Sequence, residues 1–409
     1  MQCLILAAGD GTRMLPLTAR TAKPLLRVAG RPFIEHTMSV IEAAGISDIA
    51  LLVGWQREEM MFYFAQMDHI EAPHFVEQSE RLGTAHAIAQ AEDWVSGPFL
   101  CINGDVLPSE GTLGRLVEAS SRDPSAVAMA CTHVENPTGY GIVETDERGC
   151  VTGLVEKPDR PMGNLINAGM YAFPSDIFDA IRETPMSPRG EYEITSTFEL
   201  MMGEGRLRSM EMEDPWIEVT YPWDILGANT HLMKDLEGSI EGTVEDGAHL
   251  EGPVVVREGA RVRSGTYIKG PVIIDERADV GPNCYIRPST YIGRECRVGN
   301  AVEVKNTILM DGSNIPHQNY VGDSVIMEDV NLGAGTKVAN LRLDGANVTS
   351  SSRGMRVDTG LRKLGAIIGP GVKIGINASI DVGTVLSENA FVGPGARVRG
   401  YVAPGARVL

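Results

Sequence analysis

The sequence predicts two parts with different folds: an open α/β domain over residues 1–236 and a parallel β-helix over residues 237–409. In the first part, short apolar runs alternate with helical patterns, which is typical of a parallel sheet flanked by helices. In the second part, an apolar residue recurs at every sixth position. This period indicates hexapeptide repeats stacked as a β-helix.

The acidic composition argues against a nucleic-acid-binding protein, because the net charge is −18 and the pI is near 4.9. The six cysteines are scattered without a CxxC pair, so we expect buried thiols in a reducing compartment rather than structural zinc. No apolar run approaches the roughly 20 residues that a bilayer span needs, and the amino terminus lacks the basic region of a signal peptide. These observations predict a cytoplasmic protein whose partners include neither nucleic acid nor a membrane.

Three apolar runs predict buried parallel strands, at Cys3–Ala8, Asp48–Gly54 and Pro98–Asp105. Helical patterns fall between them, at Pro32–Ala44, Arg57–Gln66 and Thr84–Trp94. Residues 126–173 are rich in β-forming segments and predict an added mixed-sheet lobe, and Tyr221–Leu236 predicts a closing helix.

The hexapeptide repeat begins at Val244, and every sixth residue from there to Val304 is Val, Leu or Ile. Three hexapeptides make one triangular coil, in which the apolar residue points inward. The repeat resumes at Ile326 in a shifted phase and is interrupted a second time later. We therefore expect residues 305–325 and 339–367 to leave the coil, and excursions from a rigid scaffold commonly carry function.

A glycine-rich segment, "LAAGDGTRMLPLTARTAKPLL", follows the first predicted strand. Gly9 and Gly11 let backbone N–H groups approach a bound anion, and Arg13 and Lys23 add positive charge. The segment lacks the GK[ST] ending of a Walker P-loop, and it is not a GxGxxG turn. It therefore predicts a phosphate-binding loop of another kind.

This segment resembles the signature of the sugar-1-phosphate nucleotidyltransferases, which join a sugar 1-phosphate to a nucleoside triphosphate and release pyrophosphate. The other motifs of that family follow in order: "EQSERLGTAHA", "NGDV", "NPTGYGIVE", "VEKP", "INAGMY" and "DPWIEVTYPWDILGAN". The resemblance implies a Rossmann-like domain in which Arg13 and Lys23 are catalytic. It implies nucleotide binding by Leu6, Ala8, Gly9, Gly11, Thr12, Gln78, Gly83 and Thr84. It implies sugar-phosphate binding by Gly141, Glu156, Lys157 and Asn167.

The same resemblance implies a Mg²⁺ ion held by Asp105 of "NGDV". The second metal ligand of the family is usually an Asp in a W-x-D triplet, and here the triplet ends in Glu218. Glutamate is one methylene longer than aspartate. Glu218 is the expected second ligand, and Asp224 is the alternative.

The stretches Cys284–Thr290 and Asn300–Thr336 resemble the acetyltransferase domain of the bifunctional bacterial enzymes that acetylate glucosamine 1-phosphate and then uridylylate it. Those enzymes have a left-handed β-helix with active sites between subunits, which implies a left-handed helix and a homotrimer here. The resemblance implies sugar-phosphate binding by Arg287, Lys305, Tyr320 and Asn331, acetyl-CoA binding by Ala334 and Asn340, and catalysis by His317.

Histidine suits the predicted acetyl transfer for a chemical reason. An amino-sugar nitrogen is protonated at neutral pH, so a base must remove a proton as the nitrogen attacks the thioester, and an unperturbed imidazole has a pKa of about 6.5. The bacterial family carries a lysine shortly after its "NYDG" segment. Here "NLRLDGANV" has none and is two residues longer, and the following "SSSRGMRVDTGLRKLGAI" supplies arginines instead, as in archaeal-type bifunctional enzymes.

The expected function is therefore double. The α/β domain transfers a uridylyl or thymidylyl group from UTP or dTTP to a sugar 1-phosphate, with N-acetylglucosamine 1-phosphate expected, and the β-helix acetylates an amino-sugar 1-phosphate with acetyl-CoA. One alternative is a monofunctional nucleotidyltransferase, for example one specific for glucose 1-phosphate, whose β-helix serves only oligomerisation or regulation. A sensor that binds sugar nucleotides without turnover is a third possibility. The sequence leaves the sugar, and the choice between UTP and dTTP, open.

Overall fold

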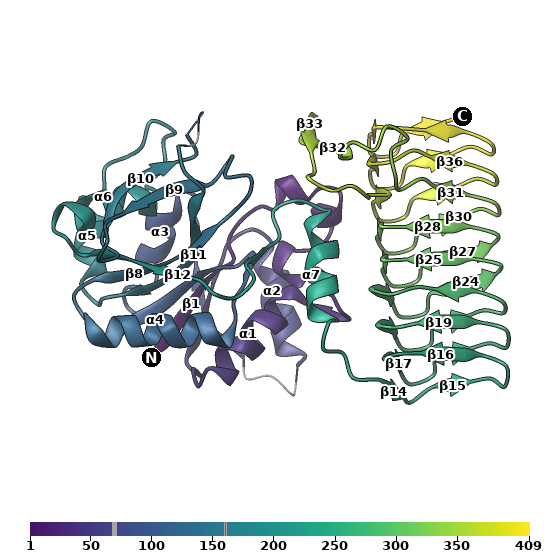
Figure 1. The fold of residues 1–409 in the computed structure, drawn as a ribbon, viewed down its shortest axis with the longest axis horizontal. Helices are drawn as coiled ribbons and strands as arrows, with labels where there is room; N and C mark the ends of the chain where they lie inside the picture. The colour runs from purple at the N-terminus through teal and green to yellow at the C-terminus, as the bar shows by residue number, and fades with distance from the viewer. Residues whose placement is uncertain (68–71, 159, 161) are drawn as a thin grey trace. The chain divides into compact units, whose positions relative to one another are not determined.

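The computed structural model describes residues 1–67, 72–158, 160 and 162–409 (Figure 1). The chain forms two compact units: Met1–Asp10 with Phe33–Glu218, and Gly11–Pro32 with Val219–Leu409. The first unit is a Rossmann-like α/β domain, and the second is built on a left-handed parallel β-helix, so the predicted fold class is confirmed. The domain boundary at residue 236 stays a prediction.

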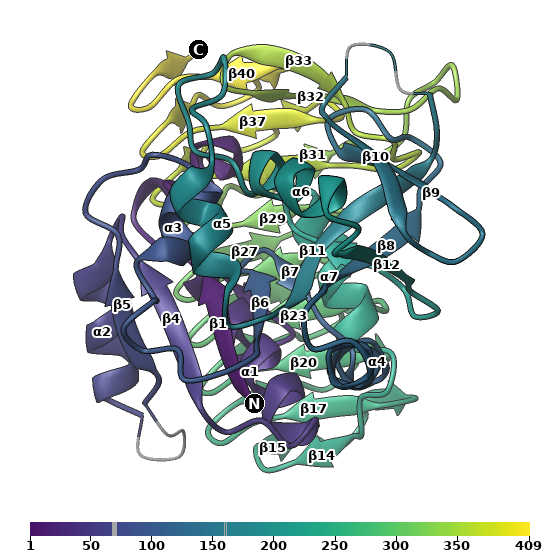
Figure 2. The same ribbon diagram turned by 90° about the vertical axis from the view of Figure 1, so that its left-hand side faces the viewer.

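The first unit is organised around one mixed sheet with the strand order β10-β9-β11-β6-β1-β4-β5 (Figure 2). Strands β6, β1, β4 and β5 are parallel, β11 runs antiparallel to β6, and β8 joins β11 to β12. The strands are β1 (Gln2–Leu6), β4 (Ile49–Val53), β5 (His74–Glu77), β6 (Phe99–Asn103), β8 (Val127–His133), β9 (Gly141–Thr145), β10 (Val151–Glu156), β11 (Leu165–Phe173) and β12 (Leu207–Glu211). The three predicted parallel strands are therefore present, and so are the β-rich segments after residue 126.

The helices of this unit pack in two groups. The helices are α1 (Phe33–Ala43), α2 (Arg57–Ala65), α3 (Thr84–Ala89), α4 (Glu110–Arg122), α5 (Ile177–Glu183) and α6 (Ile194–Gly203). Helix α4 packs on β8 and β11 beside α1, whereas α3, α5 and α6 pack against one another. Leu4 and Phe99 belong to the buried core that α3, α5 and α6 share. Because strand side chains alternate between faces, Ile5 points to the opposite side of the sheet.

One predicted helix is shorter than expected. The helical pattern Thr84–Trp94 forms a helix only to Ala89, and the following residues form three-residue turns. The carbonyl of Trp94 instead accepts a hydrogen bond of 3.0 Å from the side chain of Gln2, so a tertiary contact replaces the last helical turn. The closing helix α7 (Asp224–Leu232) is present within the predicted segment and belongs to the second unit.

The β-helix consists of three parallel sheets, which we call sheets I, II and III. Sheet I contains β14 (Ser239–Ile240), β17 (Val254–Val256), β20 (Val272–Ile274), β23 (Thr290–Ile292), β26 (Ile308–Leu309), β29 (Val325–Ile326), β34 (Ala366–Ile368), β37 (Thr384–Leu386) and β40 (Tyr401–Val402). Sheet II contains β15 (Thr243–Val244), β18 (Arg261–Val262), β21 (Asp279–Val280), β24 (Arg297–Asn300), β27 (Asn314–His317), β30 (Asn331–Leu332), β35 (Lys373–Ile374), β38 (Phe391–Val392) and β41 (Arg407–Val408). Sheet III contains β16 (His249–Glu251), β19 (Tyr267–Lys269), β22 (Tyr285–Ile286), β25 (Glu303–Lys305), β28 (Tyr320–Gly322), β31 (Lys337–Val338), β36 (Ser379–Ile380) and β39 (Arg397–Val398).

The repeating apolar residues form one continuous core inside the three sheets. Val262, Ile268 and Ile274, one from each sheet, are fully buried, as the period predicts. Cys284 and Cys296 occupy the small-residue positions, and burial raises the pKa of their thiols to about 11 and about 12. All six cysteines are free and five are buried, which confirms that none forms a disulfide.

The first predicted excursion, residues 305–325, is wrong. Strands β26, β27 and β28 continue sheets I, II and III, and Leu309, Ile315 and Val321 are fully buried in the common core. The phase shifts because two steps between inward residues of this stretch span five positions instead of six, from Val304 to Leu309 and from Val321 to Ile326. The coil therefore passes through this stretch without leaving the scaffold.

The second predicted excursion is real. After Ala339 the chain leaves the coil and returns at β34. It carries an antiparallel hairpin made of β32 (Thr349–Ser352) and β33 (Met355–Asp358). This hairpin is the one feature of the second interruption with regular structure in the described residues.

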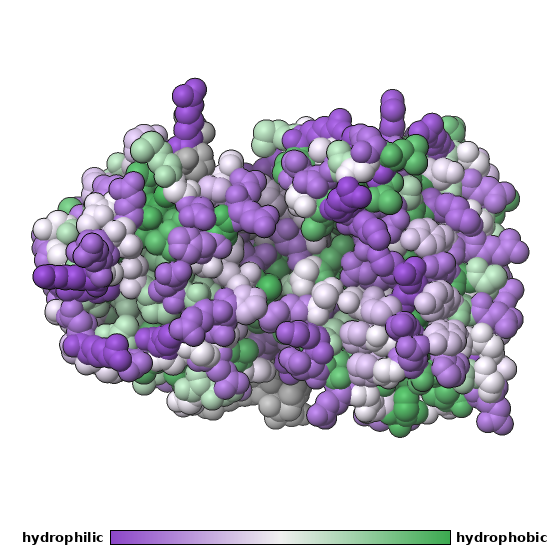
Figure 3. All heavy atoms as spheres, in the orientation of Figure 1, coloured by the Kyte–Doolittle hydropathy of each residue, from purple (hydrophilic) through white to green (hydrophobic). Residues whose placement is uncertain are grey.

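Polar side chains cover most of the face of the protein that Figure 3 shows, with apolar ones scattered between them. In the described part of the chain, no helix combines the length and the apolar character that crossing a membrane requires.

Replacing Leu309 tests the continuity of the coil. Leu309→Ala should lower the free energy of unfolding by about 2–5 kcal/mol, because it leaves a cavity in a closed core. Leu343→Ala is the matched control, since Leu343 is 108% exposed in the second interruption and its loss should cost less than about 0.5 kcal/mol. Denaturant unfolding followed by circular dichroism measures both, and equal small losses would mean that Leu309 lies in a loop.

Candidate functional sites

The first candidate site lies where parallel strands of the α/β sheet end. Leu6 at the end of β1 is in register with Asn103 at the end of β6. A Cβ placed on Gly54, just after β4, would lie 3.1 Å from the Cβ of Ala8 and 3.2 Å from the carbonyl oxygen of Gln78. Three predicted nucleotide-binding positions therefore share the carboxyl edge of the sheet, where open α/β sheets bind ligands.

The predicted base-recognition segment is tightly packed. Gln78 is buried, and its Nε2 donates to the carbonyl of Gly83 at 3.4 Å and lies 3.2 Å from Nδ1 of His86. Gly83 has φ +110°, and a Cβ there would lie 2.4 Å from the carbonyl oxygen of Tyr192, so a glycine is required. The hydroxyl of Thr84 accepts from the first backbone N–H of α6 at 2.8 Å. Thr84 therefore connects the base-recognition segment to the start of α6.

The four predicted sugar-phosphate residues of this unit lie together. Gly141 and Glu156 are paired in register, and a Cβ on Gly141 would lie 3.0 Å from Oε2 of Glu156 and 3.8 Å from Cβ of Asn167. Nζ of Lys157 is 3.1 Å from Oε1 of Glu156. Arg189 lies 3.8 Å from the same oxygen, and the sequence patterns did not single it out.

The two predicted metal ligands lie at a short antiparallel strand pair. Strands β7 (Val106–Leu107) and β13 (Ile217–Glu218) place Glu218 opposite Val106, the residue after Asp105. The indole of Trp216 donates to the carbonyl of Ala168 at 3.1 Å and fixes the strand that carries Glu218. A divalent ion that takes one or two protein carboxylates together with phosphate oxygens is the kind of ligand that the predicted Asp105 and Glu218 would suit.

The alternative ligand, Asp224, has a structural role. Its Oδ2 accepts hydrogen bonds from the backbone N–H groups of Thr220 and Tyr221, at 2.9 and 2.6 Å, at the start of α7. Among the described residues, no group of three or more His, Cys, Asp or Glu side chains is arranged to hold a metal. The Asp105–Glu218 pair therefore fits a substrate-completed site better than a closed structural one.

The predicted cationic residues of the loop belong to the second unit. Gly11 has φ +62°, and a Cβ there would lie 2.9 Å from Cγ2 of Thr18, so the tight turn needs a glycine. The Thr18 hydroxyl donates to the Gly11 carbonyl at 2.8 Å, which closes the loop on itself. Arg13 is exposed and Lys23 is half-buried.

On the β-helix, four of the predicted acetyltransferase residues gather on or just after the middle strands β22, β25, β28 and β31 of sheet III. Arg287 pairs with Glu303 at 2.9 Å, and Nζ of Lys305 lies 3.1 and 3.2 Å from the two carboxylate oxygens of Asp323. The amide of Asn340 donates to the same carboxylate at 2.5 Å. Glu303 and Asp323 were not predicted. The only sequence signal for them is their spacing: Glu303 lies one coil after Tyr285, and Asp323 lies one coil after Lys305.

Tyr320 is the fourth residue of this cluster. A Cβ placed on Gly322 would lie 2.8 Å from the Tyr320 hydroxyl and 2.7 Å from Nδ2 of Asn340, so the glycine leaves room for both. Burial raises the pKa of Tyr320, and the nearby carboxylates of Glu303 and Asp323 raise it further. The phenol therefore stays protonated at neutral pH and is available as a hydrogen-bond donor.

The remaining predicted residues lie on the sheet II side. His317 is exposed at the end of β27, and its carbonyl accepts from the N–H of Gly335, the residue after Ala334, at 3.0 Å. Asn331 is in register with Asn314, three residues before His317. Within the described chain, no hydrogen bond joins this group to the cluster on sheet III.

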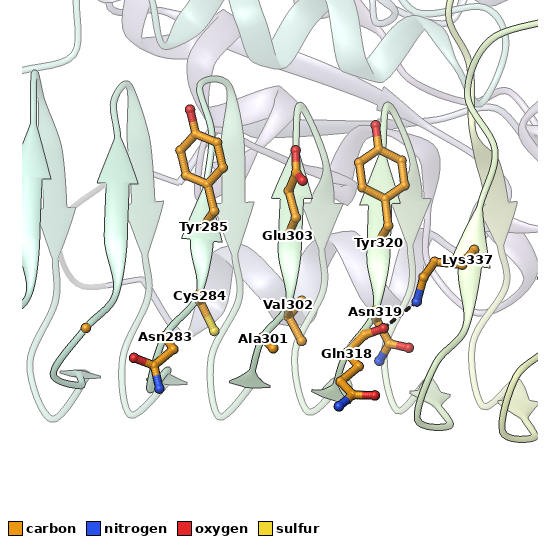
Figure 4. A pocket seen from close by; sticks show the side chains of 11 residues that line it. Asn283, Cys284, Tyr285, Ala301, Val302, Glu303, Gln318, Asn319, Tyr320 and Lys337 are labelled. Carbon is orange, nitrogen blue, oxygen red and sulfur yellow. Dashed lines mark hydrogen bonds between the residues drawn. The ribbon is translucent and has the colours of Figure 1, made fainter.

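A pocket of about 400 Å³ lies along the corner between sheets II and III, and Tyr320 is the predicted acetyltransferase residue that lines it (Figure 4). Tyr285, Glu303 and Tyr320 project to the same side from three successive coils, and Gln318 lies at the corner below them. Gln318, the residue after His317, lines the pocket together with Tyr320, whereas His317 itself does not line it. It is roomy enough for part of a sugar phosphate.

Comparisons with known proteins bear on both halves. Residues 2–235 match the nucleotidyl transferase family, and residues 268–358 match the GMPPB C-terminal domain. The chain is 38% identical to the bifunctional sugar-1-phosphate nucleotidylyltransferase/acetyltransferase of Sulfurisphaera tokodaii over 99% of both chains. The chain belongs to this bifunctional family. It is also 39% identical to the bifunctional protein GlmU of Methanocaldococcus jannaschii, over 96% of this chain and 93% of that protein.

Membership in the bifunctional family supports the double function over the monofunctional alternative. It implies a nucleoside triphosphate, a sugar 1-phosphate and acetyl-CoA as substrates, together with a divalent metal ion. Among solved structures, a Bacillus anthracis protein described as a glucose-1-phosphate thymidylyltransferase, in complex with a sucrose, matches with a TM-score of 0.53. It is 27% identical and covers 59% of this chain and 98% of its own.

The two ion pairs of sheet III should differ in their contribution to stability. Asp323→Ala should lower the free energy of unfolding by about 3 kcal/mol, because it leaves Lys305 without its partner beside a buried position. Glu303→Ala is the control, since both members of its pair are more than a third exposed and such pairs contribute less than about 1 kcal/mol. Denaturant unfolding measures the difference, and equal losses would contradict the structural role of Asp323.

Proposed function

We propose that this protein acetylates glucosamine 1-phosphate with acetyl-CoA on its β-helix and transfers a nucleotidyl group from UTP or dTTP to N-acetylglucosamine 1-phosphate on its α/β domain. The observation that carries the nucleotidyl transfer is the β7–β13 pair, which sets Glu218 opposite Val106, the residue after Asp105. The acetyl transfer is supported by the ion-paired Arg287 and Lys305, which stand near Tyr320, and by a pocket that Glu303 and Tyr320 line.

In the proposed nucleotidyl transfer, a phosphate oxygen of the sugar 1-phosphate attacks the α-phosphorus in line, the bond from the α-phosphorus to the bridging oxygen breaks, and pyrophosphate leaves. Two polyanions must meet, so the chain contributes mainly positive charge and positioning. Arg13 and Lys23 neutralise phosphate oxygens, and the backbone N–H groups around Gly9 and Gly11 hold others. Leu6, Ala8, Thr12 and Thr84 complete the proposed nucleotide-binding set.

The base and sugar ends of the substrates take the remaining residues. Gln78 and Gly83 offer amide and backbone groups to the edge of uracil or thymine. The proposed sugar-phosphate set is Gly141, Glu156, Lys157 and Asn167. Asp105 and Glu218 would hold a Mg²⁺ ion, which neutralises phosphate charge when bound.

In the proposed acetyl transfer, the amine nitrogen attacks the thioester carbonyl carbon while a ring nitrogen of His317 takes its proton. The carbon–sulfur bond then breaks, and CoA leaves as the thiol after protonation. Arg287 and Lys305 hold the sugar phosphate, with Tyr320 donating to it, and Asp323 keeps the Lys305 ammonium in place. Asn331 orients the amine, and Ala334 and Asn340 form the proposed acetyl-CoA side.

Two variants separate the two activities. Asp105→Asn should reduce pyrophosphate release from UTP and N-acetylglucosamine 1-phosphate by at least about a hundredfold, while acetyl transfer is retained. His317→Ala should do the reverse, with a loss of about 10²–10⁴-fold in acetyl transfer to glucosamine 1-phosphate. In each variant, the activity that is retained shows that the protein is folded. Undiminished acetyl transfer in His317→Ala would contradict its role as the base, and a wild-type protein without that activity would remove the proposal for the β-helix.

We further propose that the protein is a homotrimer that associates through sheet III. His317 and the Arg287 cluster lie on different sheets of one chain, so a second copy offers a way to complete a site between them. Sheet III also carries an exposed aromatic ladder: His249 stacks on Tyr267 at 4.7 Å, and Tyr267 contacts Tyr285 at 5.7 Å. Both tyrosines are 38% exposed. Exposed aromatic side chains in a row are typical of protein interfaces.

A charge in the aromatic ladder should break the trimer. Tyr267→Glu should shift the mass in solution from about three chains to one, because it would bury three carboxylates in the assembly. Tyr401→Glu is the control, since Tyr401 is 52% exposed on sheet I and its replacement should leave the trimer intact. Light scattering coupled to size exclusion measures the mass, and a monomeric wild-type protein would refute the proposal.

A further inference from the structure

The hairpin β32–β33 has no part in the acetyl transfer proposed above. Its two strands are joined by Arg353 and Gly354, with φ +51° and +74°. Positive φ at both central residues is the pattern of a type I′ turn, in which Asn, Asp and Gly are the preferred residues. An arginine in the left-handed region carries a steric cost. An arginine at this position of the turn therefore calls for an explanation in what its side chain contacts.

The tip of the hairpin contacts the anion-binding loop. The Nη2 of Arg353 donates to Oγ1 of Thr12, and the hydroxyl of Ser352 donates to the backbone carbonyl of Arg13 at 3.1 Å. Both partners directly follow Gly11, and hairpin and loop belong to the same compact unit. A segment more than three hundred residues away in the sequence thus joins the loop proposed to bind nucleotide phosphates.

The charge of Arg353 is uncompensated. Across the described residues, no carboxylate lies within ion-pair distance of its guanidinium, whereas Arg342 in the same interruption pairs with Asp344. A guanidinium has five N–H donors, and the bond to Thr12 uses only one of them. Planar guanidinium groups match the oxygen geometry of phosphates. In a chain of net charge −18, an unpaired arginine beside Arg13 concentrates positive charge at the loop.

We propose that Arg353 is a further phosphate-binding residue of the nucleotidyl transfer, which binds the triphosphate tail of the nucleotide from the β-helix side of the loop. Ser352 positions the Arg13 backbone beneath it. This inference rests on the proposed nucleotidyl transfer and adds to it a substrate contact from the second interruption of the coil. Because the contact is with phosphate, its contribution to nucleotide binding should not depend on the base or on the identity of the sugar 1-phosphate.

Three substitutions at Arg353 test the proposal in the full-length protein. Arg353→Ala should raise the KM for UTP, and equally for dTTP, by about tenfold, with kcat, the KM for the sugar 1-phosphate and acetyl transfer unchanged. Arg353→Lys should restore most of the affinity, because it keeps the charge. Arg353→Gln keeps a hydrogen-bond donor for Thr12 but no charge, and it should behave like the alanine variant.

The matched control is Arg356→Ala in the same hairpin. The Nε of Arg356 donates to Oγ1 of Thr349, across the hairpin itself, so its loss should leave the KM for UTP unchanged. A wild-type KM in Arg353→Ala, or a wild-type KM in Arg353→Gln, would overturn phosphate binding. Thermal melting and retained acetyl transfer show whether each variant is folded.

Direct binding separates this inference from the proposed function. If the wild-type protein releases no pyrophosphate from either nucleotide, the proposed nucleotidyl transfer fails. Calorimetric titration with inorganic tripolyphosphate then still tests Arg353, without any turnover. Binding that weakens about tenfold in Arg353→Ala but not in Arg356→Ala supports the assignment, and equal binding by both variants overturns it.

Discussion

The structure of the second unit depends on one constraint, which is that each side of every coil must point an apolar residue into the prism. The parallel register stacks equivalent positions of successive coils about 4.8 Å apart. An outward position therefore recurs on the same face once per coil, and Arg287 and Lys305 stand in one column for this reason alone. A scaffold of this kind gathers functional side chains by sequence period, where most enzymes must gather them from separate loops.

At the two five-residue steps the length of the repeat changes, but the inward position still carries an apolar residue. Both lie at the same edge of the prism, one after Lys305 and one after Gly322. Asn306 and Asp323 take the left-handed conformation there, which residues of their type tolerate better than most. The side chain of Asn306 also donates to Asp323 at 2.8 Å, so the tight edge and the buried ion pair of Lys305 support each other. The residues at these shortened steps, Asn306 and Asp323, are therefore also part of the candidate site.

Features that repeat along the sequence or lie within one short motif could be predicted. Contacts between distant residues without a periodic pattern could not. Counting in sixes identified the inward column up to Val304, but a five-residue step hides Leu309 from that count and suggested a loop where the coil continues. Asp105 was predicted from its own tetrapeptide, whereas the pairing of the next residue, Val106, with Glu218 depends on two-residue strands more than a hundred residues apart. The partners of Lys305 and Arg287 were missed because acidic residues on a polar face have no distinguishing local pattern.

The least predictable feature is that Gly11–Pro32 belongs with the β-helix, and a buried carboxylate provides one of the links between them. Asp275 is fully buried, which is costly for a charge unless it is paired. Its oxygens accept from the Tyr291 hydroxyl at 2.7 Å and lie within 3.5–4.0 Å of Arg27, Arg257 and Arg294.

Arg27 comes from the loop segment and the other partners come from the coil, so the buried carboxylate links the segment to the β-helix. Asn229 adds a second anchor, because its side chain accepts from Ala29 and donates to the carbonyl of Ser289. A loop held in this way has lost its conformational freedom before any phosphate arrives. The ordering cost that binding would otherwise bear is smaller as a result. The glycine-rich loop is therefore held on its unit by Asp275 and Ser289, residues of the same coil that carries Arg287 and Lys305.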